Sequence, residues 1–581
     1  MRMACVLIVL LGCGRIGFAP TGDGGDDAPD GSRISLELPA GGQMGWLAQA
    51  PDGAWYASSE TGGSFRSDDH VTWTPCGARY SRGIAVAADN SVWAGGTQIG
   101  RSTDRCATWT NTNAPRFANN VQVAGGIVYG LLDNSLVRWN GTGWTNVPTP
   151  LDPTVYWSIA SAGGVWLAAT EDGLLRSTDG MTWTTITAGV PNPPIRKVVL
   201  GATRGYLLAN GGGPAGIACT NNGGVTWSAC DAFGGYTLLV DPMNDQRVLA
   251  GIYDDLIVTT DAFMAVTRQL RDDVGLDQAS ILDLLPAADG SIVLAGDRGV
   301  FASPPGSTLA FEPRMTGISA WDIDQMLRVG DDIYVATRGG VLHSTIGQPF
   351  TISTSGILWN TNIGGLAALP DGRVLLAGRN LNVTADRGTT WTEVLSLGVE
   401  DYYFAPAMTV AGVRAYAGTK TRILVADPPY TTWTPLLVAG ATRQVNAVVV
   451  VDGTVYAGTE DGLFAAPDGT SFTMLWAETI RAITQLADGG LAIATADGVI
   501  MTDSQRTMLA TPKLVGRNVT RVREIDTTLV ATTDTGVSYS RDRGVTWLPV
   551  PGAETMPASD ALFDGELVLG ANWGLVRVPL P

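Results

Sequence analysis

Two kinds of side chain in this sequence could recognise a sugar: carboxylates in predicted turns and aromatic rings in predicted loops. A carboxylate accepts hydrogen bonds from hydroxyl groups, and an aromatic face packs against the C–H surface of a sugar ring. Solvated turn charges and packed rings are the alternative interpretation. No catalytic residue can be named from the sequence. The candidate ligand-binding residues are the acidic pairs Glu171/Asp172 and Glu460/Asp461 and the aromatic residues Trp359, Tyr402, Tyr403 and Trp476.

Several other chemistries lack the residues that they need. The sequence has no phosphate-binding Gly-x-x-x-x-Gly-Lys-Ser/Thr motif, no His-Glu-x-x-His motif and no Cys-x-x-Cys pair. Its two histidines, His70 and His343, do not stand near a candidate nucleophile, which argues against a Ser-His-Asp hydrolase. The formal charge of −18 argues against nucleic-acid binding. We expect neither a metal nor a cofactor.

The N-terminus has the features of a secretion signal. Residues 1–12 combine Arg2 with a short apolar run, and Leu10-Leu11-Gly12-Cys13 looks like a bacterial lipobox. This pattern predicts cleavage and lipidation at Cys13, with a plain secretory signal as the alternative. Residues 13–32 then form an acidic, glycine-rich tether.

No further apolar run is long enough for a membrane-spanning helix. Gly14 follows the lipidated cysteine in place of the aspartate that retains many lipoproteins in the inner membrane. The sequence therefore predicts a lipid-anchored protein of the bacterial cell envelope, on the outer membrane or the cell surface.

Four further cysteines suit an oxidising compartment. Cys219 and Cys230 flank one predicted hairpin, whereas Cys76 and Cys106 belong to adjacent repeats. A bridge within each pair is expected. A metal site is the alternative, but no histidine stands near either pair.

The elements that would position these residues recur about every 40 residues. In each repeat, short runs with alternating apolar residues are separated by tight Asp-Gly turns, which predicts three or four β-strands. Four strands in about 40 residues is the size of a propeller blade. Fourteen repeats begin near residues 44, 82, 119, 156, 195, 235, 279, 320, 362, 404, 444, 480, 519 and 559.

A second signature, Ser/Thr-x-Asp-x-Gly-x-Thr-Trp, stands before the last strand of several repeats. It is clearest in residues 384–391 and 540–547, and it is nearly lost near residues 261, 304, 344 and 503. The carboxylate can close the turn by accepting backbone hydrogen bonds, and the indole can pack inward. The structural box residues are Asp104, Asp179, Asn222, Asp386 and Asp542, with Trp109, Trp183, Trp227, Trp391 and Trp547.

This signature resembles the Asp-box (BNR) repeat of sialidase-like β-propellers. The resemblance implies an all-β fold in which the box turns lie on one face of a ring and ligands bind on the opposite face. The box aspartates would then be structural. Sialidase activity is not expected, because the Phe/Tyr-Arg-Ile-Pro segment of that family does not occur here.

Propellers usually hold four to eight blades, so fourteen repeats predict two seven-bladed rings. Their boundaries are expected at residues 33–318 and 319–581. The last repeat shows only three predicted strands, and residues 33–39 form an orphan strand. We expect this N-terminal strand to complete the last blade and so to remove exposed sheet edges.

Paired rings with Asp boxes resemble the xyloglucan-hydrolysing glycosidases. The repeats also resemble sortilin and the photosystem II stability factor family, which bind proteins or peptides. The sequence therefore predicts a monomeric binding or scaffold protein of the envelope, with a polysaccharide or a protein as its ligand. The alternative is a glycoside hydrolase that uses paired carboxylates.

Overall fold

The structure is a computed structural model. Several features predicted from the sequence lie outside the described residues: the signal peptide, Cys13, the tether, the strand at residues 33–39, and Trp359, Tyr402 and Tyr403. The model describes residues 41–580 apart from residues 60–61, 77–81, 116–117, 152–154, 210–215, 253–254, 271, 277–279, 307, 322, 338–339, 347, 354–363, 379, 398–406, 421, 439, 442–443, 509–512 and 572–573.

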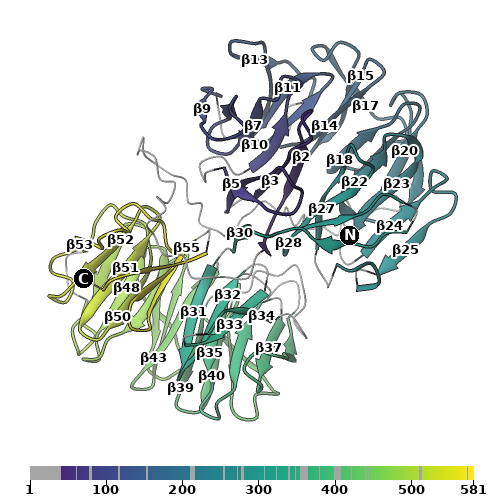
Figure 1. Cartoon of the computed structure of the whole chain (residues 1–581). Coiled ribbons are helices and arrows are strands. Elements are labelled where there is room, and N and C mark those ends of the chain that lie inside the picture. The colour runs from purple at the N-terminus through teal and green to yellow at the C-terminus, as the bar shows by residue number, and fades with distance from the viewer. Residues whose placement is uncertain are drawn as a thin grey trace. The chain divides into compact units, whose positions relative to one another are not determined.

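The described part of the chain divides into two compact units, within residues 41–321 and within residues 323–580, with Gly574 grouping with the first. Each unit holds seven antiparallel sheets in chain order (Figure 1). Twelve of the fourteen sheets have four strands, and those that begin at Ile480 and Asp560 have three in the described part of the chain. The predicted all-β fold with two sets of seven blades is confirmed.

In each unit the first strands of the seven sheets contact one another in order, and the seventh contacts the first, which makes a ring. We call the units the first ring and the second ring. The inner strands of the first ring are β2 (Trp46–Gln49), β6 (Arg82–Val86), β10 (Ala118–Ala124), β14 (Tyr156–Ala162), β18 (Ile195–Leu200), β22 (Gly235–Asp241) and β26 (Ile281–Pro286). Those of the second are β31 (Ile323–Val329), β35 (Gly365–Ala368), β39 (Met408–Ala411), β43 (Val445–Val451), β47 (Ile480–Gln485), β50 (Val519–Ile525) and β54 (Asp560–Phe563).

The second strand of each blade forms the core. Strands β19 (Gly205–Ala209), β48 (Leu491–Thr495) and β51 (Thr528–Thr533) are buried at every residue. Both faces of these strands meet a neighbouring blade, so their sequences are nearly continuous in apolar and small residues. The fourth strands are outermost, and β17 (Trp183–Ile186) is exposed at its centre.

The box turns connect third and fourth strands through one repeated set of hydrogen bonds. In the last complete box, Oδ1 of Asp542 accepts from the backbone N–H of Thr546 (2.8 Å) and from Oγ of Ser540 (2.8 Å). Arg543 and Gly544 take positive φ values of 60° and 77°. Asp104, Asp386 and Asn222 accept from the equivalent threonine N–H at 2.9, 2.9 and 3.1 Å.

Two boxes that the sequence suggests are nearly lost keep the same geometry. Oδ1 of Asp261 accepts from the N–H of Ala265 (2.9 Å), and Oδ1 of Asp503 accepts from the N–H of Thr507 (2.8 Å). The turn needs only an acceptor and well-placed N–H groups. The glycine and the tryptophan of the signature are therefore dispensable, which is why the motif underestimates the number of such turns.

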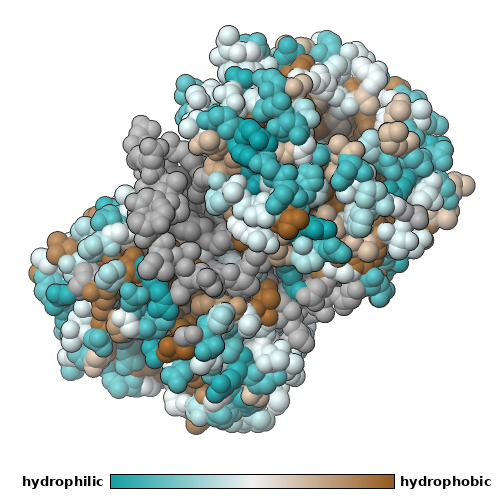
Figure 2. Space-filling view, in the orientation of Figure 1, coloured by the Kyte–Doolittle hydropathy of each residue, from teal (hydrophilic) through white to brown (hydrophobic). Residues whose placement is uncertain are grey.

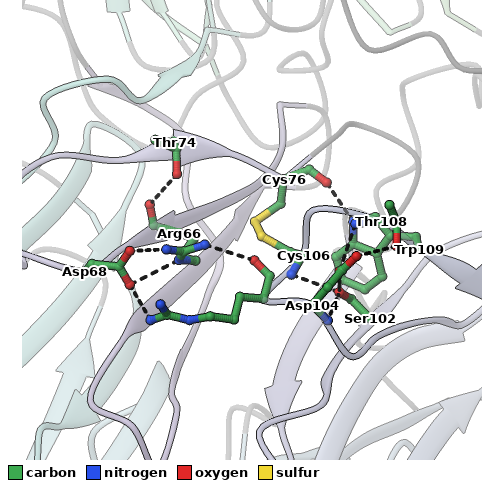
Figure 3. The surroundings of a disulfide bond; sticks show 10 residues. Arg66, Asp68, Thr74, Cys76, Ser102, Asp104, Cys106, Thr108 and Trp109 are labelled. Atoms are coloured by element: carbon green, nitrogen blue, oxygen red, sulfur yellow. Dashed lines mark hydrogen bonds and ion pairs between the residues drawn. A yellow bond between two sulfur atoms is a disulfide. The ribbon is translucent and has the colours of Figure 1, made fainter.

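The four cysteines of the rings form two disulfides, Cys76–Cys106 and Cys219–Cys230. The first joins the end of one blade to the box turn of the next, where Cys106 has a φ of 66° in the place of the box glycine. Figure 3 shows this junction, in which Nε1 of Trp109 also donates to the carbonyl of Cys76 (2.7 Å). The bridge within the Cys219–Cys230 pair spans a single hairpin.

The box aspartates predict a specific acid sensitivity. Hydrogen bonds from a threonine hydroxyl and a backbone N–H lower the pKa of Asp104, Asp386 and Asp542 to about 2, below the ordinary value of 3.8. Because the folded pKa is depressed, this contribution to stability is complete above about pH 4 and is lost as the pH falls towards 2.

We expect Asp542→Asn to fold normally at pH 7, because Asn222 already fills the equivalent place in its own box. Its stability should fall less steeply than that of the wild type between pH 4 and pH 2, because one fewer carboxylate takes up a proton. Asp542→Ala should lose stability at pH 7 as well. Urea unfolding followed by circular dichroism at pH 7 and pH 3 tests this, and equal pH dependence in wild type and Asp542→Asn would contradict it.

Candidate functional site

The inner strands share an irregularity at their N-terminal ends. In ten blades one residue of the inner strand has no opposite residue on the second strand, which makes a β-bulge. Bulges re-aim a side chain and are frequent beside binding sites. The bulged residues are Gly83, Asn119, Trp157, Arg196, Tyr236 and Leu282 in the first ring and Asp324, Asn446, Arg481 and Thr520 in the second.

The bulged side chains lie beside the turns that join second and third strands. Nε1 of Trp157 donates to Glu171 (3.0 Å), and Nδ2 of Asn119 donates to Asp133 (2.6 Å). Glu171 stands in the turn between β15 (Val165–Thr170) and β16 (Gly173–Ser177). We call the bulged residues of a ring and these turns its mouth. All bulged residues except Gly83 are half-buried, so a ligand can reach them.

The first-ring mouth contains a three-residue network. The guanidinium of Arg196 lies over the Trp157 ring, with its central carbon 3.8 Å from the ring centroid. The same indole donates to Oε2 of Glu171. The other carboxylate oxygen, Oε1, is buried and has no hydrogen-bond partner among the described residues. Glu171 therefore has an acceptor that no described protein group satisfies.

The second-ring mouth is built around Arg481. Burial lowers the pKa of Arg481 to about 10, although the carboxylates of Glu460 and Asp534 act in the opposite direction. Its Nε is buried without a hydrogen-bond partner in the described chain. The same holds for two atoms beside the turns of this mouth: Nε1 of Trp476, which pairs with Leu463 next to the fourth-blade turn, and Oδ1 of Asn518, whose Nδ2 donates to Asp534 (3.3 Å). The mouth thus combines unsatisfied donors with acceptors, as recognition of hydroxyl groups requires.

The structure places some, but not all, of the sequence-predicted ligand-binding residues in the mouths. Glu171 and Glu460 lie in the mouths, and Trp476 is half-buried at the end of β46 (Thr473–Trp476). Trp157 and Arg196 could not be predicted from the sequence, because a bulge is a property of strand register and leaves no signature in a single strand.

In each acidic pair the structure shows a different environment for the aspartate than for the glutamate. The backbone N–H of Asp172 donates to Oγ1 of Thr170 (3.2 Å), and that of Asp461 donates to Oγ1 of Thr459 (3.0 Å). Both aspartates thus help to close their turns through the backbone, whereas the bulged indole contacts Glu171. Asp172 is exposed, and no hydrogen bond of its side chain is found within the described ranges, while Asp461 is half-buried. A ligand contact of Asp172 or Asp461 therefore remains a prediction from the sequence, without a bulged residue to support it.

The arrangement of sheets is shared with a solved enzyme structure. A GH74 enzyme of Niastella koreensis superposes with a TM-score of 0.57 and 16% sequence identity, over 94% of this chain and 98% of the enzyme. The chain is a two-propeller protein. At this identity the likeness concerns the fold alone.

Two further structures are less similar to this two-propeller protein. PorZ, a surface component of the type IX secretion system of Porphyromonas gingivalis, has a TM-score of 0.49 and 14% identity, over 94% of this chain and 86% of PorZ. The extracellular domain of a putative hybrid two-component system of B. thetaiotaomicron has a TM-score of 0.40 and 15% identity, over 94% and 82%. No protein-family model and no curated protein gave a significant match.

The described residues contain neither a metal-binding cluster nor a membrane-spanning helix. No cluster of three or more His, Cys, Asp or Glu side chains that could hold a metal ion occurs among them. They include no helix that is long and apolar enough to cross a membrane. On the face that Figure 2 shows, hydrophilic residues predominate and the hydrophobic areas are small and scattered.

Proposed function

We propose that this two-propeller protein binds a neutral, hydroxyl-rich ligand, a polysaccharide at the cell envelope, through the mouths of its rings. The observation that carries the proposal is the Glu171–Trp157–Arg196 network. A sugar hydroxyl both donates and accepts, so it can donate to Oε1 of Glu171 and accept from a guanidinium N–H. The net charge of −18 favours a neutral polymer over a polyanion.

The remaining parts of the proposal concern location. The lipobox-like segment supports lipidation of Cys13, which would tether the rings to the outer membrane or the cell surface as a monomer. The box turns support a place among the sialidase-like Asp-box propellers, without sialidase activity. In this role the rings act as a rigid platform that presents bulged side chains to the ligand.

Binding of immobilised polysaccharides by the full chain, purified in detergent, tests the function. We expect Glu171→Gln to weaken binding at least about tenfold, which is about 1.4 kcal/mol. The matched control is Asp289→Asn, which makes the same charge change in an exposed turn between the first and second strands of the last blade of this ring, outside the mouth, and should bind like the wild type. If Glu171→Gln and the wild type bound polysaccharide with equal affinity, the Glu171–Trp157–Arg196 network would not be part of the binding site.

The same polysaccharides distinguish the alternatives. Release of reducing ends would assign a glycoside hydrolase, whose inverting form needs carboxylates about 6.5–9.5 Å apart. Binding of a protein in place of any polysaccharide would keep the platform and change its ligand. A chain that binds no polysaccharide at all would overturn the proposal.

A further inference from the structure

The two rings share one combination of residues, which in each ring comes from the fourth and fifth blades. In each ring the turn of the fourth blade reads Thr-Glu-Asp-Gly, at residues 170–173 and 459–462. Oγ1 of Thr170 donates to the carbonyl of Gly173 (2.9 Å), and Oγ1 of Thr459 donates to that of Gly462 (3.0 Å). The two turns therefore have the same internal hydrogen bond, and they present Glu171 and Glu460 equivalently.

The fifth blade of each ring supplies the second half of the combination. Its inner strand begins Ile-Arg in both rings, and the bulge falls on the arginine in both, Arg196 and Arg481. These are the two arginines among the ten bulged residues, and they stand seven blades apart. Since the other bulges carry seven different residue types, a shared arginine at one ring position indicates a shared role.

In both rings the glutamate and the arginine are coupled. In the first ring Trp157 connects them, with its ring under the guanidinium and its N–H on the carboxylate. In the second ring Oγ1 of Thr479, two residues before Arg481, donates to the carbonyl of Glu460 (3.0 Å), and the Glu460 carboxylate opposes the effect of burial, which lowers the pKa of Arg481. Each pair also includes a buried atom without a hydrogen-bond partner in the described chain, Oε1 of Glu171 in one and Nε of Arg481 in the other.

The junctions of the fourth and fifth blades differ between the two rings in one bulged residue. The fourth-blade bulge carries Trp157 in the first ring and Asn446 in the second, where Nδ2 of Asn446 donates to the carbonyl of Ile480 (2.9 Å). An aromatic ring adds apolar contact with the C–H face of a sugar. The second ring lacks an aromatic residue at this bulge, so we expect its fourth–fifth blade junction to bind a sugar more weakly than that of the first ring.

We propose that each ring of this protein has one saccharide-binding site, at the junction of its fourth and fifth blades, so that one chain binds two sugar units. The inference rests on the proposed function and extends it from one site to two. Two sites on one chain raise the avidity for a polymer that presents many copies of the same unit. They also let one chain cross-link two polymer strands.

Isothermal titration calorimetry of the full chain with neutral gluco-, manno-, xylo- and galacto-hexasaccharides tests the number of sites. The wild type should bind two molecules of the preferred hexasaccharide, with the second more weakly. Glu171→Gln should remove the stronger site, in the first ring, and bind one hexasaccharide weakly. Glu460→Gln should remove the weaker site, in the second ring, and bind one hexasaccharide with the higher affinity. The double variant should not bind.

Matched controls are Asp289→Asn in the first ring and Asp427→Asn in the second, two exposed aspartates in turns that do not belong to the mouths. Both should keep two sites, and melting temperatures should show that every variant folds. If the wild type bound one hexasaccharide and Glu460→Gln bound it with the same affinity and stoichiometry, the proposed site in the second ring would be wrong. The proposed function would not be affected. No binding of any hexasaccharide or polysaccharide would overturn both.

Discussion

Replacement of Asp560 by alanine is expected to lower the free energy of unfolding of the second ring by about 3–5 kcal/mol. The Asp560 side chain is fully buried and accepts from Nε and a terminal nitrogen of Arg523 at 2.8 and 2.7 Å. It also accepts from the N–H of Met326 (2.9 Å), on the first inner strand of the ring. Alanine would leave the guanidinium groups of Arg521, whose side chain is 14% exposed, and of Arg523, whose side chain is 30% exposed, without their counter-charge.

This carboxylate joins the last blade of the second ring to the first. Burial acts to raise the pKa of Asp560, but the guanidinium groups of Arg523 and Arg521 outweigh it and hold the pKa below its ordinary value. Its stabilising contribution is therefore complete above about pH 4 and is lost as the pH falls. In the first ring Asp283 accepts from the N–H of Leu47 (3.1 Å) across the equivalent junction.

The control for Asp560→Ala is an exposed aspartate with an equally regular arginine contact. Asp427 accepts from Nε and a terminal nitrogen of Arg414, both at 2.9 Å, but both side chains are about half exposed. Exposed pairs contribute about 0–1 kcal/mol, so Asp427→Ala should change stability by no more than that. Calorimetric and urea unfolding of both variants decide the matter, and similar losses in the two would contradict the closing role of Asp560.

Removal of the Cys76–Cys106 disulfide is expected to lower the free energy of unfolding of the first ring by about 3–4 kcal/mol. The bridge closes a loop with a sequence separation of 30, and it ties two blades together. The Cys219–Cys230 bridge, with a separation of 11, constrains the unfolded chain less, and its removal should cost about 2.5–3 kcal/mol. Serine replacements of each pair, compared by urea unfolding without reductant, measure both losses.

The position of Cys106 offers a sharper version of the same experiment. Its φ of 66° suits glycine, the residue that the box signature has at this place. Cys76→Ser combined with Cys106→Gly should therefore be more stable than Cys76→Ser with Cys106→Ser, by about 0.5–1 kcal/mol. A larger loss for the shorter Cys219–Cys230 bridge than for the Cys76–Cys106 bridge would show that loop closure does not set these energies.

The sequence predicts the parts of this fold that are local. Repeats of about 40 residues give the number of blades, because each blade is one continuous segment with its own turns. The closing carboxylates could not be predicted, since Asp560 and Met326 are 234 residues apart and their contact exists only once the ring is formed. The predicted N-terminal strand of the last blade remains a prediction, because residues 33–39 lie outside the described part of the chain.

The candidate site also has a part that the sequence predicts and a part that only the structure shows. Glu171 and Glu460 are visible in the sequence because a Thr-Glu-Asp-Gly turn has a recognisable form. The same form does not tell the glutamate from the aspartate beside it, because only the folded ring shows which of the two meets a bulged residue. Trp157 and Arg196 sit within ordinary strand patterns, and only the pairing with the second strand shows that each has no opposite residue. A repeat alignment that compares the second residue of every inner strand would have revealed the arginines at equivalent places.

The recurrent bulge has a consequence for how such a protein can change over evolutionary time. A bulged residue takes no part in the regular pairing of the sheet, and here it ranges from Gly83 to Trp157 without altering the blade. The residue at these ten positions can therefore change while the strand pairing of the blade is preserved. For the same reason, randomising them offers a route to engineered receptors.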